Sequence, residues 1–269
     1  MKFLMPLKEI ENLAKQIKNS KDPEYIENGL RKIVEQYEII NFECSYSMPF
    51  FRARLVEKGE PYSHVSEISY PPKDFAKVGR VNEEGQPFLY LSFNASTALS
   101  EIKAMEGDVI QLSQFVPISR SPRVLMIGEY SRISRGNNSF FPDIVPYVSQ
   151  VLKSLQEKSP AHVNCFLYPD LFFDEILKMP DASVSNYIHS RILARLLLDE
   201  PHNLEGIMYH SVANAGGFNV ALPADKADSL LRFDHTILVR IKNVFSYGIY
   251  DYEAVQMSRG KTESGRIVW

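Results

Sequence analysis

The sequence predicts an α+β protein, with a mixed β-sheet core, flanking helices and a helical extension at the N-terminus. Apolar residues recur at helical spacing through the first forty residues, and after them the chain changes to short alternating runs typical of strands. Further helical patterns interleave with these runs, which are too short and irregular for a doubly wound parallel sheet. We therefore expect a helical extension over residues 1–44 and a main domain over residues 45–269.

Two helices are expected in the extension. Their apolar positions repeat every three or four residues on either side of the breaker "SKDP". These positions are Leu7, Ile10, Ala14 and Ile17 in the first helix and Ile26, Leu30, Ile33, Val34 and Tyr37 in the second. The pair is interpreted as a helical cover packed on the main domain, and an arm that binds a partner is the alternative.

The main domain begins with the strand "PFFRARLV", in which Arg52 and Arg54 project from the same face because side chains alternate along a strand. Two arginines are unusual on a face that should join an apolar core. Further strands are expected over residues 88–93, 123–128, 206–212, 218–222 and 236–244. Helices are expected after Asn94, over about 142–157 and over 183–200, whereas residues 129–180 carry several prolines and the weakest signal.

Composition and charge narrow the class of function. The 269 residues are 45% hydrophobic and 23% charged, with a net charge of −3 and a pI of about 6.1, as in an ordinary globular protein. No basic surplus points to nucleic acid, although a local basic cleft for a small anion fits this balance. The N-terminus lacks the features of a secretory leader, no apolar run could cross a membrane, and the two cysteines are far apart. We expect a cytoplasmic protein that binds neither a membrane nor, directly, nucleic acid.

Several kinds of active site are disfavoured. The sequence has no GxxxxGK[ST] phosphate loop, no GxGxxG after a strand and no HExxH, and its six histidines are scattered rather than set at metal-ligand spacing. Ser211 lies in "YHSVA", which lacks the GxSxG pattern of serine hydrolases. We therefore expect no metal.

Glu101 occupies an unusual position in the stretch "GRVNEEGQPFLYLSFNASTALSEI". With Asn94 or Ser96 as the cap, Glu101 lies at the border of the buried stripe of the helix. That stripe comprises Ala95, Ala98, Leu99, Ile102 and Met105. By spacing alone, the simpler interpretation is a solvated residue whose stem covers the edge of the core.

Other polar and aromatic residues have two interpretations as well. Arg52, Arg54 and Arg80 can form weak surface ion pairs, or a fork that grips a phosphate or carboxylate. Tyr90 has the pattern of a core aromatic residue.

The segment "GIMYHSVANAGGFNVAL" ends a strand and enters a glycine-rich turn. Tyr209 and Ser211 fit a local cap or turn. Gly216 and Gly217 permit a bend or the close approach of a ligand to the main chain.

Together, three segments resemble the RES domain family, which supplies the toxin of many bacterial toxin–antitoxin pairs. They are "FFRAR", "GRVNEEGQPFLYLSFNASTALSEI" and "GIMYHSVANAGGFNVAL", in this order, and the second carries the strongest likeness. The resemblance covers residues 45 to about 245. It implies a fold similar to that of ADP-ribosylating toxins and an activity on NAD⁺ as substrate, with no separate cofactor.

The resemblance also implies which residues form the site. By position, the arginine, glutamate and serine of the family fall on Arg52, Glu101 and Ser211. The residues implied to bind NAD⁺ are Arg80, Tyr90, Tyr209 and Asn219.

The sequence departs from the family pattern in places. Val81 stands where an aromatic residue is common, and Val212 and Ala213 stand where an arginine commonly follows the serine. The long separation between the glutamate and the serine indicates an insertion within about 105–185.

The implied activity is that of a toxin that cleaves the nicotinamide–ribose bond of NAD⁺, by hydrolysis or phosphorolysis, and so depletes cellular NAD⁺. Glu101 would stabilise the oxocarbenium charge at the anomeric carbon, and Arg52 would hold the pyrophosphate. Tyr90 would stack on nicotinamide, and Ser211 would bond to the ribose or the amide. The alternatives are a mono-ADP-ribosyltransferase that modifies a host protein and a non-catalytic module that binds NAD⁺. The implied protein partner is a cognate antitoxin.

Overall fold

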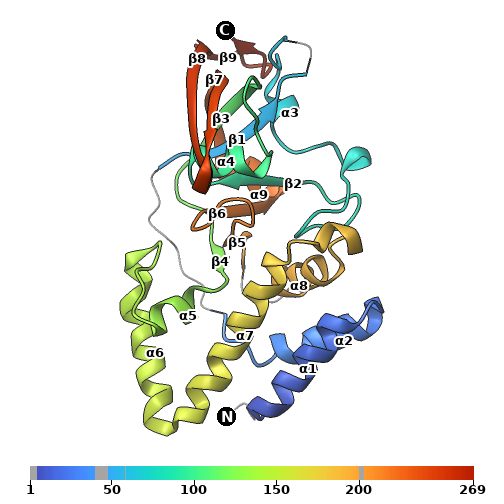
Figure 1. Ribbon diagram of the computed structural model, residues 1–269, viewed down its shortest axis with the longest axis vertical. Coiled ribbons are helices and arrows are strands. Elements are labelled where there is room, and N and C mark those ends of the chain that lie inside the picture. The colour runs from blue at the N-terminus through green and yellow to red at the C-terminus, as the bar shows by residue number, and fades with distance from the viewer. Residues whose placement is uncertain (1–4, 40–47, 58, 200–202) are drawn as a thin grey trace. The chain divides into compact units, whose positions relative to one another are not determined.

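The computed structural model describes residues 5–39, 48–57, 59–199 and 203–269 (Figure 1). The chain forms two compact units, each described here by itself. The helical unit combines Met1–Ser45, Val78–Glu84 and Arg123–Tyr209, and the sheet unit combines Tyr46–Lys77, Gly85–Pro122 and His210–Trp269. Cys44 and the boundary predicted between residues 44 and 45 lie outside the described residues, so the division into an extension and a main domain stays a prediction.

The two N-terminal helices are confirmed. α1 spans Leu7–Asn19 and α2 spans Pro23–Val34, where the Asp22 side chain accepts the Glu24 N–H at the start of the helix. The predicted apolar positions are buried except Leu7: Ile10, Ala14, Ile17, Ile26, Leu30, Ile33, Val34 and Tyr37. α1 packs against α7 (Pro160–Lys178) and α2 against α8 (Ile188–Leu198). The pair therefore completes the core of the helical unit.

The remaining elements of the helical unit lie largely where the sequence signal is weakest. They are β4 (Val124–Met126), α5 (Glu129–Ser134), a 3₁₀ turn η2 (Pro142–Ile144), α6 (Val145–Lys158), α7, a 3₁₀ turn η3 (Ala182–Ser185), α8 and β5 (Gly206–His210). β4 and β5 pair in parallel. α7 escapes prediction because Pro169 lies inside it and its buried residues do not form a narrow stripe.

The helix predicted over 183–200 is shorter than expected. It begins at Ile188, because Asn186 and Tyr187 adopt left-handed backbone angles that no α-helix accommodates. The helix predicted over about 142–157 is confirmed as η2 followed by α6.

The sheet unit is built on six antiparallel strands in the order β6-β2-β1-β3-β7-β8. Their bounds are β1 Phe50–Leu55, β2 Phe88–Ser92, β3 Val109–Pro117, β6 Phe218–Pro223, β7 Leu231–Phe245 and β8 Ile249–Met257. Two of these strands, β3 and β8, are missing from the prediction. β3 lies in the segment interpreted as an insertion, and β8 is exposed along nearly all of its length, so neither shows clear alternation of buried and exposed residues.

Shorter elements complete the sheet unit. They are α3 (Val65–Ile68), η1 (Lys73–Phe75), α4 (Ala95–Glu101), α9 (Ala224–Leu230), η4 (Ser246–Gly248) and the paired strands β9 (Gly260–Lys261) and β10 (Ile267–Val268). The predicted α+β class, with parallel and antiparallel strands and N-terminal helices, is confirmed. Within the described ranges, no helix is both long and apolar enough to cross a membrane.

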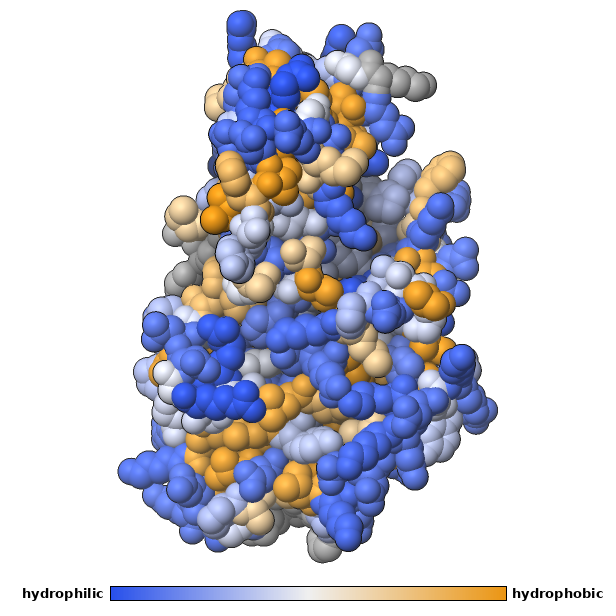
Figure 2. Space-filling view, in the orientation of Figure 1, coloured by the Kyte–Doolittle hydropathy of each residue, from blue (hydrophilic) through white to orange (hydrophobic). Residues whose placement is uncertain are grey.

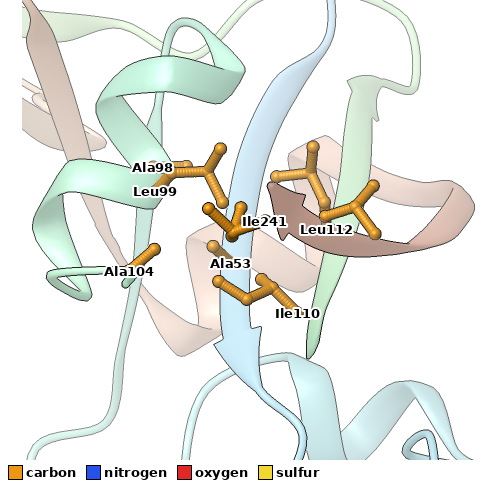
Figure 3. Packing of buried hydrophobic residues seen from close by; sticks show 8 residues of the cluster. Ala53, Ala98, Leu99, Ala104, Ile110, Leu112 and Ile241 are labelled. Atoms are coloured by element: carbon orange, nitrogen blue, oxygen red, sulfur yellow. The ribbon is translucent and has the colours of Figure 1, made fainter. Parts of the chain in front are cut away.

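α4 packs on one face of the sheet through small residues (Figure 3). Ala98 and Leu99 of the helix meet Ala53 of β1 in a buried cluster that also takes in residues of β3 and β7. Because side chains alternate along β1, Arg52 and Arg54 lie on the opposite face. The prediction for the end of the helix was wrong: α4 stops at Glu101, Lys103 turns the chain with φ 53°, and Met105 is 67% exposed instead of buried.

Candidate active site

Glu101 is placed by the connection from β2 into α4. The strand ends at Ser92, and Asn94 caps the helix by accepting the Thr97 N–H at 2.8 Å, as predicted. The short helix then carries Glu101 as its last residue, with its side chain exposed. A strand, a cap and a helix of two turns therefore fix where this carboxylate lies.

One oxygen of Glu101 is held by two polar side chains. Oε1 accepts the Ser211 hydroxyl at 2.6 Å and the Asn219 amide Nδ2 at 2.5 Å. Asn219 is fixed in turn, because its Oδ1 accepts the hydroxyl of Ser92, its direct neighbour across β2 and β6, at 2.7 Å. No described residue bonds the second oxygen, Oε2, which is thus available to a ligand. The structure therefore brings together Glu101, Ser211 and Asn219, three of the predicted site residues.

Ser211 uses its whole hydrogen-bonding capacity within the protein. Its Oγ donates to Glu101 and accepts the N–H groups of Ala213 at 3.2 Å and Asn214 at 2.9 Å. It is also buried. A hydroxyl with its one proton and both lone pairs engaged has nothing left for a substrate, so this geometry makes Ser211 a positioning residue for Glu101 and for the loop over residues 211–217.

That loop is pinned to α4 by residues that sequence analysis missed. Asn214 Nδ2 donates to Thr97 Oγ1 at 3.1 Å. Gly217 lies so close to the same side chain that an added Cβ would be 2.4 Å from Thr97 Oγ1, which explains why glycine is needed there. Gly216 turns the chain with φ 83°. The glycines thus serve both the bend and the close approach, although the approach is to α4.

Arg52 is a largely desolvated cation at the point where β1 and β2 diverge. The two strands pair at one position, Phe51 with Ser92, and beyond it Arg52 Nη1 donates to the Tyr90 carbonyl at 2.9 Å. Its Nε is buried without a hydrogen-bond partner, and no described acidic residue forms an ion pair with it. Burial, with the nearby positive charge of Arg54 as a second cause, lowers the pKa of the Arg52 guanidinium to about 10. Such a group has spare donors for an anion.

Arg52 and Glu101 are linked only through neighbouring residues, because Arg52 projects from the face of β1 opposite α4. Arg52 follows Phe51, whose partner Ser92 bonds Asn219, and Asn219 bonds Glu101. The half-buried Tyr90 lies two residues before Ser92, so its side chain is on the same face of β2 as this network. Tyr90 is therefore brought to the site as well.

Two predicted site residues belong to the helical unit. Arg80 Nη1 donates to the carbonyls of Leu177 at 2.6 Å and Met179 at 3.2 Å, and its guanidinium lies 5.4 Å from the ring centroid of Tyr187. Arg80 thereby closes the C-terminal end of α7. Tyr209 is buried in β5. Contact of either residue with NAD⁺ stays a prediction.

Comparison with protein-family models matches residues 49–240 to the RES domain. The match covers most of the chain and includes Arg52, Glu101, Ser211 and Asn219, so the chain belongs to the RES domain family. This membership is consistent with an NAD-related enzyme in a toxin–antitoxin context. A comparison with curated proteins gives no match.

Replacement of Ser211 by alanine tests the positioning role. Ser211→Ala leaves the Ala213 and Asn214 N–H groups without their acceptor, so we expect their amide hydrogen exchange to accelerate about tenfold or more. Ser211→Thr, which keeps the hydroxyl, should restore protection. Ser100→Ala is the control, because among the described residues the Ser100 hydroxyl bonds only to Ser96 O, within α4. Unchanged exchange at both amides in Ser211→Ala would contradict the role.

Proposed function

We propose that the protein cleaves the nicotinamide–ribose bond of NAD⁺ and acts as a toxin that depletes cellular NAD⁺ until a cognate antitoxin protein restrains it. The observation that carries the proposal is the state of Glu101. Its carboxylate is exposed at the end of α4. Two donors fix Oε1, and no described residue bonds Oε2. Membership of the RES domain family supports the same class of chemistry.

The reaction needs what this carboxylate supplies. As the bond from the ribose C1 to the nicotinamide nitrogen breaks, its electron pair leaves with the neutral nicotinamide and positive charge develops on the ribose. Glu101 Oε2 would accept hydrogen bonds from the ribose hydroxyls and stabilise that charge electrostatically. In hydrolysis, the oxygen of water bonds to C1 and a proton is released, giving ADP-ribose. In phosphorolysis, a phosphate oxygen takes that place and gives ADP-ribose 1-phosphate.

Arg52 would bind the pyrophosphate that links the two nucleosides. A planar guanidinium can grip two phosphate oxygens at once, and partial desolvation strengthens the attraction because water screens it less. The pyrophosphate would also offset the cost of keeping an unpaired cation buried in this unit. Tyr90, on the same strand as Ser92, would stack on nicotinamide.

The test is to incubate the purified chain with NAD⁺, with and without phosphate, and to resolve the products by chromatography. We expect nicotinamide release, with ADP-ribose indicating hydrolysis and its 1-phosphate indicating phosphorolysis. Arg52→Lys should lower kcat/KM by about 10- to 100-fold, mainly through KM, because an ammonium ion cannot reproduce the two-point grip. Arg54→Lys is the matched control, since Arg54 Nη1 is already engaged with the Glu67 carbonyl.

Two results would contradict the proposal. One is NAD⁺ that stays intact with the wild-type protein in every condition. The other is ADP-ribose attached to a defined acceptor protein without free ADP-ribose, which would assign the site to protein modification. An Arg52→Lys variant as active as the wild type would show that Arg52 does not bind the substrate. The cleavage proposal would be unaffected.

A further inference from the structure

The hairpin that joins β7 and β8 ends in a tip whose apolar side chains are exposed. The tip residues Phe245, Tyr247 and Ile249 are 53%, 93% and 57% exposed, and Val244 beside them is exposed too. Figure 2 shows hydrophobic residues at the surface over the region that the end of this hairpin occupies in Figure 1. The family match ends at residue 240, so this tip lies beyond it.

The tip rests against the loop that Ser211 positions. Gly248 approaches Asn214 so closely that an added Cβ would lie 2.6 Å from Asn214 Oδ1. Asn214 Nδ2 bonds to Thr97 on α4, and η4 lies against the same helix. Thr97 and Glu101 are four residues apart, on one face of α4, so their Cβ atoms are about 5–6 Å apart. The tip is therefore about one helical turn from the end of the helix that carries the candidate catalytic carboxylate.

Tyr247 is held in a conformation that its residue type disfavours. Its backbone has φ 64° and ψ 23°, in the left-handed region, where a residue other than glycine, asparagine or aspartate is uncommon. In the part of the chain that the structure describes, its ring stacks on no other ring and its hydroxyl bonds no acceptor. Tyr247 thus exposes a flat aromatic ring to solvent, although its backbone conformation is unfavourable.

We propose that Tyr247 stacks on the adenine ring of NAD⁺ and thereby selects the dinucleotide; the inference rests on the proposed function. The nicotinamide ring is bonded to the ribose that Glu101 would hold, and Tyr90 is an aromatic residue on that part of the sheet. Tyr247 belongs to the tip that contacts Asn214 and α4, the helix that carries Glu101, so we infer that the far end of a dinucleotide held at Glu101 reaches this tip. Stacking suits an adenine there because it needs only a flat apolar face.

The test compares two substrates that share the bond to be broken. NAD⁺ carries adenine, whereas nicotinamide mononucleotide carries the same nicotinamide–ribose bond and a phosphate but no adenine. We expect Tyr247→Ala to raise KM for NAD⁺ about tenfold or more and to leave KM for the mononucleotide unchanged. Tyr247→Phe, which keeps the ring, should behave as the wild type. Tyr252→Ala is the control on the same hairpin, because Tyr252 lies three residues beyond Ile249 in β8, roughly 10 Å from the start of that strand.

Each other result overturns the inference. An unchanged KM for NAD⁺ in Tyr247→Ala would mean that the ring does not contact this substrate, and the exposed tip would then be assigned to a protein contact. An equal rise in KM for both substrates would mean that the tip acts through the shape of the loop at Glu101.

A binding measurement separates this inference from the proposed function. If the wild type releases nicotinamide from neither substrate, the cleavage proposal fails. Calorimetry with ADP-ribose and ribose 5-phosphate then tests whether Tyr247 binds adenine. Weaker binding of ADP-ribose alone to Tyr247→Ala would support adenine stacking. Equal binding to wild type and variant, or no binding to either protein, would overturn it.

Discussion

Glu101→Gln is expected to slow nicotinamide release from NAD⁺ by about 10²- to 10⁴-fold while leaving the fold intact. The glutamine Oε1 can still accept the Ser211 hydroxyl and the Asn219 amide, so the local hydrogen bonds survive. The negative charge is lost, however, and with it the stabilisation of the developing cation. The fall should appear in kcat, because that charge arises only as the bond breaks.

The measurement is steady-state nicotinamide release beside a thermal melt of each variant. Glu101 is exposed, so the melting temperature should be nearly unchanged, which separates a chemical loss from unfolding. Glu106→Gln, an exposed glutamate in the turn after α4, is the matched control and should retain wild-type activity. A Glu101→Gln variant that turns over NAD⁺ as fast as the wild type would disprove the assignment of this carboxylate.

The second large effect is expected at Asp170, a buried carboxylate inside the helical unit. Its oxygens accept the N–H groups of Gly128 and Ser131 at the start of α5 and the hydroxyl of Tyr37, each at 2.9 Å. Asp170→Ala leaves these three donors without an acceptor, and each unsatisfied buried group is costly. We expect a loss of about 2–4 kcal/mol in unfolding free energy, seen as a fall of roughly 5–15 °C in melting temperature.

The stability contributed by Asp170 should depend on pH. Burial, opposed by its hydrogen bonds and assisted by Asp174, raises the pKa of Asp170 from 3.8 to about 6. The folded state therefore holds the proton more tightly than the unfolded state, so this contribution is fully present below about pH 4 and is lost as pH rises to about 6. The group thus costs on the order of 3 kcal/mol by pH 7 relative to pH 4.

Asp170→Asn reveals this titration because an amide cannot take up the proton. The gap in melting temperature between the wild type and Asp170→Asn should narrow as pH rises from 4 to 6 and stay constant above. Glu175→Gln is the control on α7: its ion pair with Lys18, at 2.7 Å, is exposed and worth little. A gap that widens with rising pH would mean that the Asp170 pKa is lowered in the folded protein.

Local patterns predict much of the fold. α1 and α2 follow from apolar residues at helical spacing, and α4 follows from the Asn94 cap directly after a strand. The elements that were not predicted have weaker secondary-structure patterns in their own sequence. β8 is exposed along nearly all of its length and is a strand because it pairs with β7, and α7 contains Pro169. Their structure depends on neighbours that are distant in sequence.

Some properties of the candidate site likewise follow from the sequence, and others depend on the folded structure. Its residue types and their order, with Arg52, Glu101 and Ser211 in segments that resemble the RES domain, are properties of the sequence, and the family match confirms the resemblance. Spacing along α4 could show only that Glu101 borders the buried stripe, and it favoured a solvated surface residue. The bonds from Ser211 and Asn219 to this carboxylate join residues more than a hundred positions apart.

The class of fold, the strongly periodic helices and the identity of the candidate residues follow from the sequence, because they depend on local spacing and on residue chemistry. Three features appear only in the folded chain: Ser211 holds Glu101 in place, Arg52 is desolvated without an acidic partner among the described residues, and the tip that carries Tyr247 contacts α4. Hydrogen-bond partners and burial depend on which distant segments meet in space. Local spacing along the chain carries no information on either.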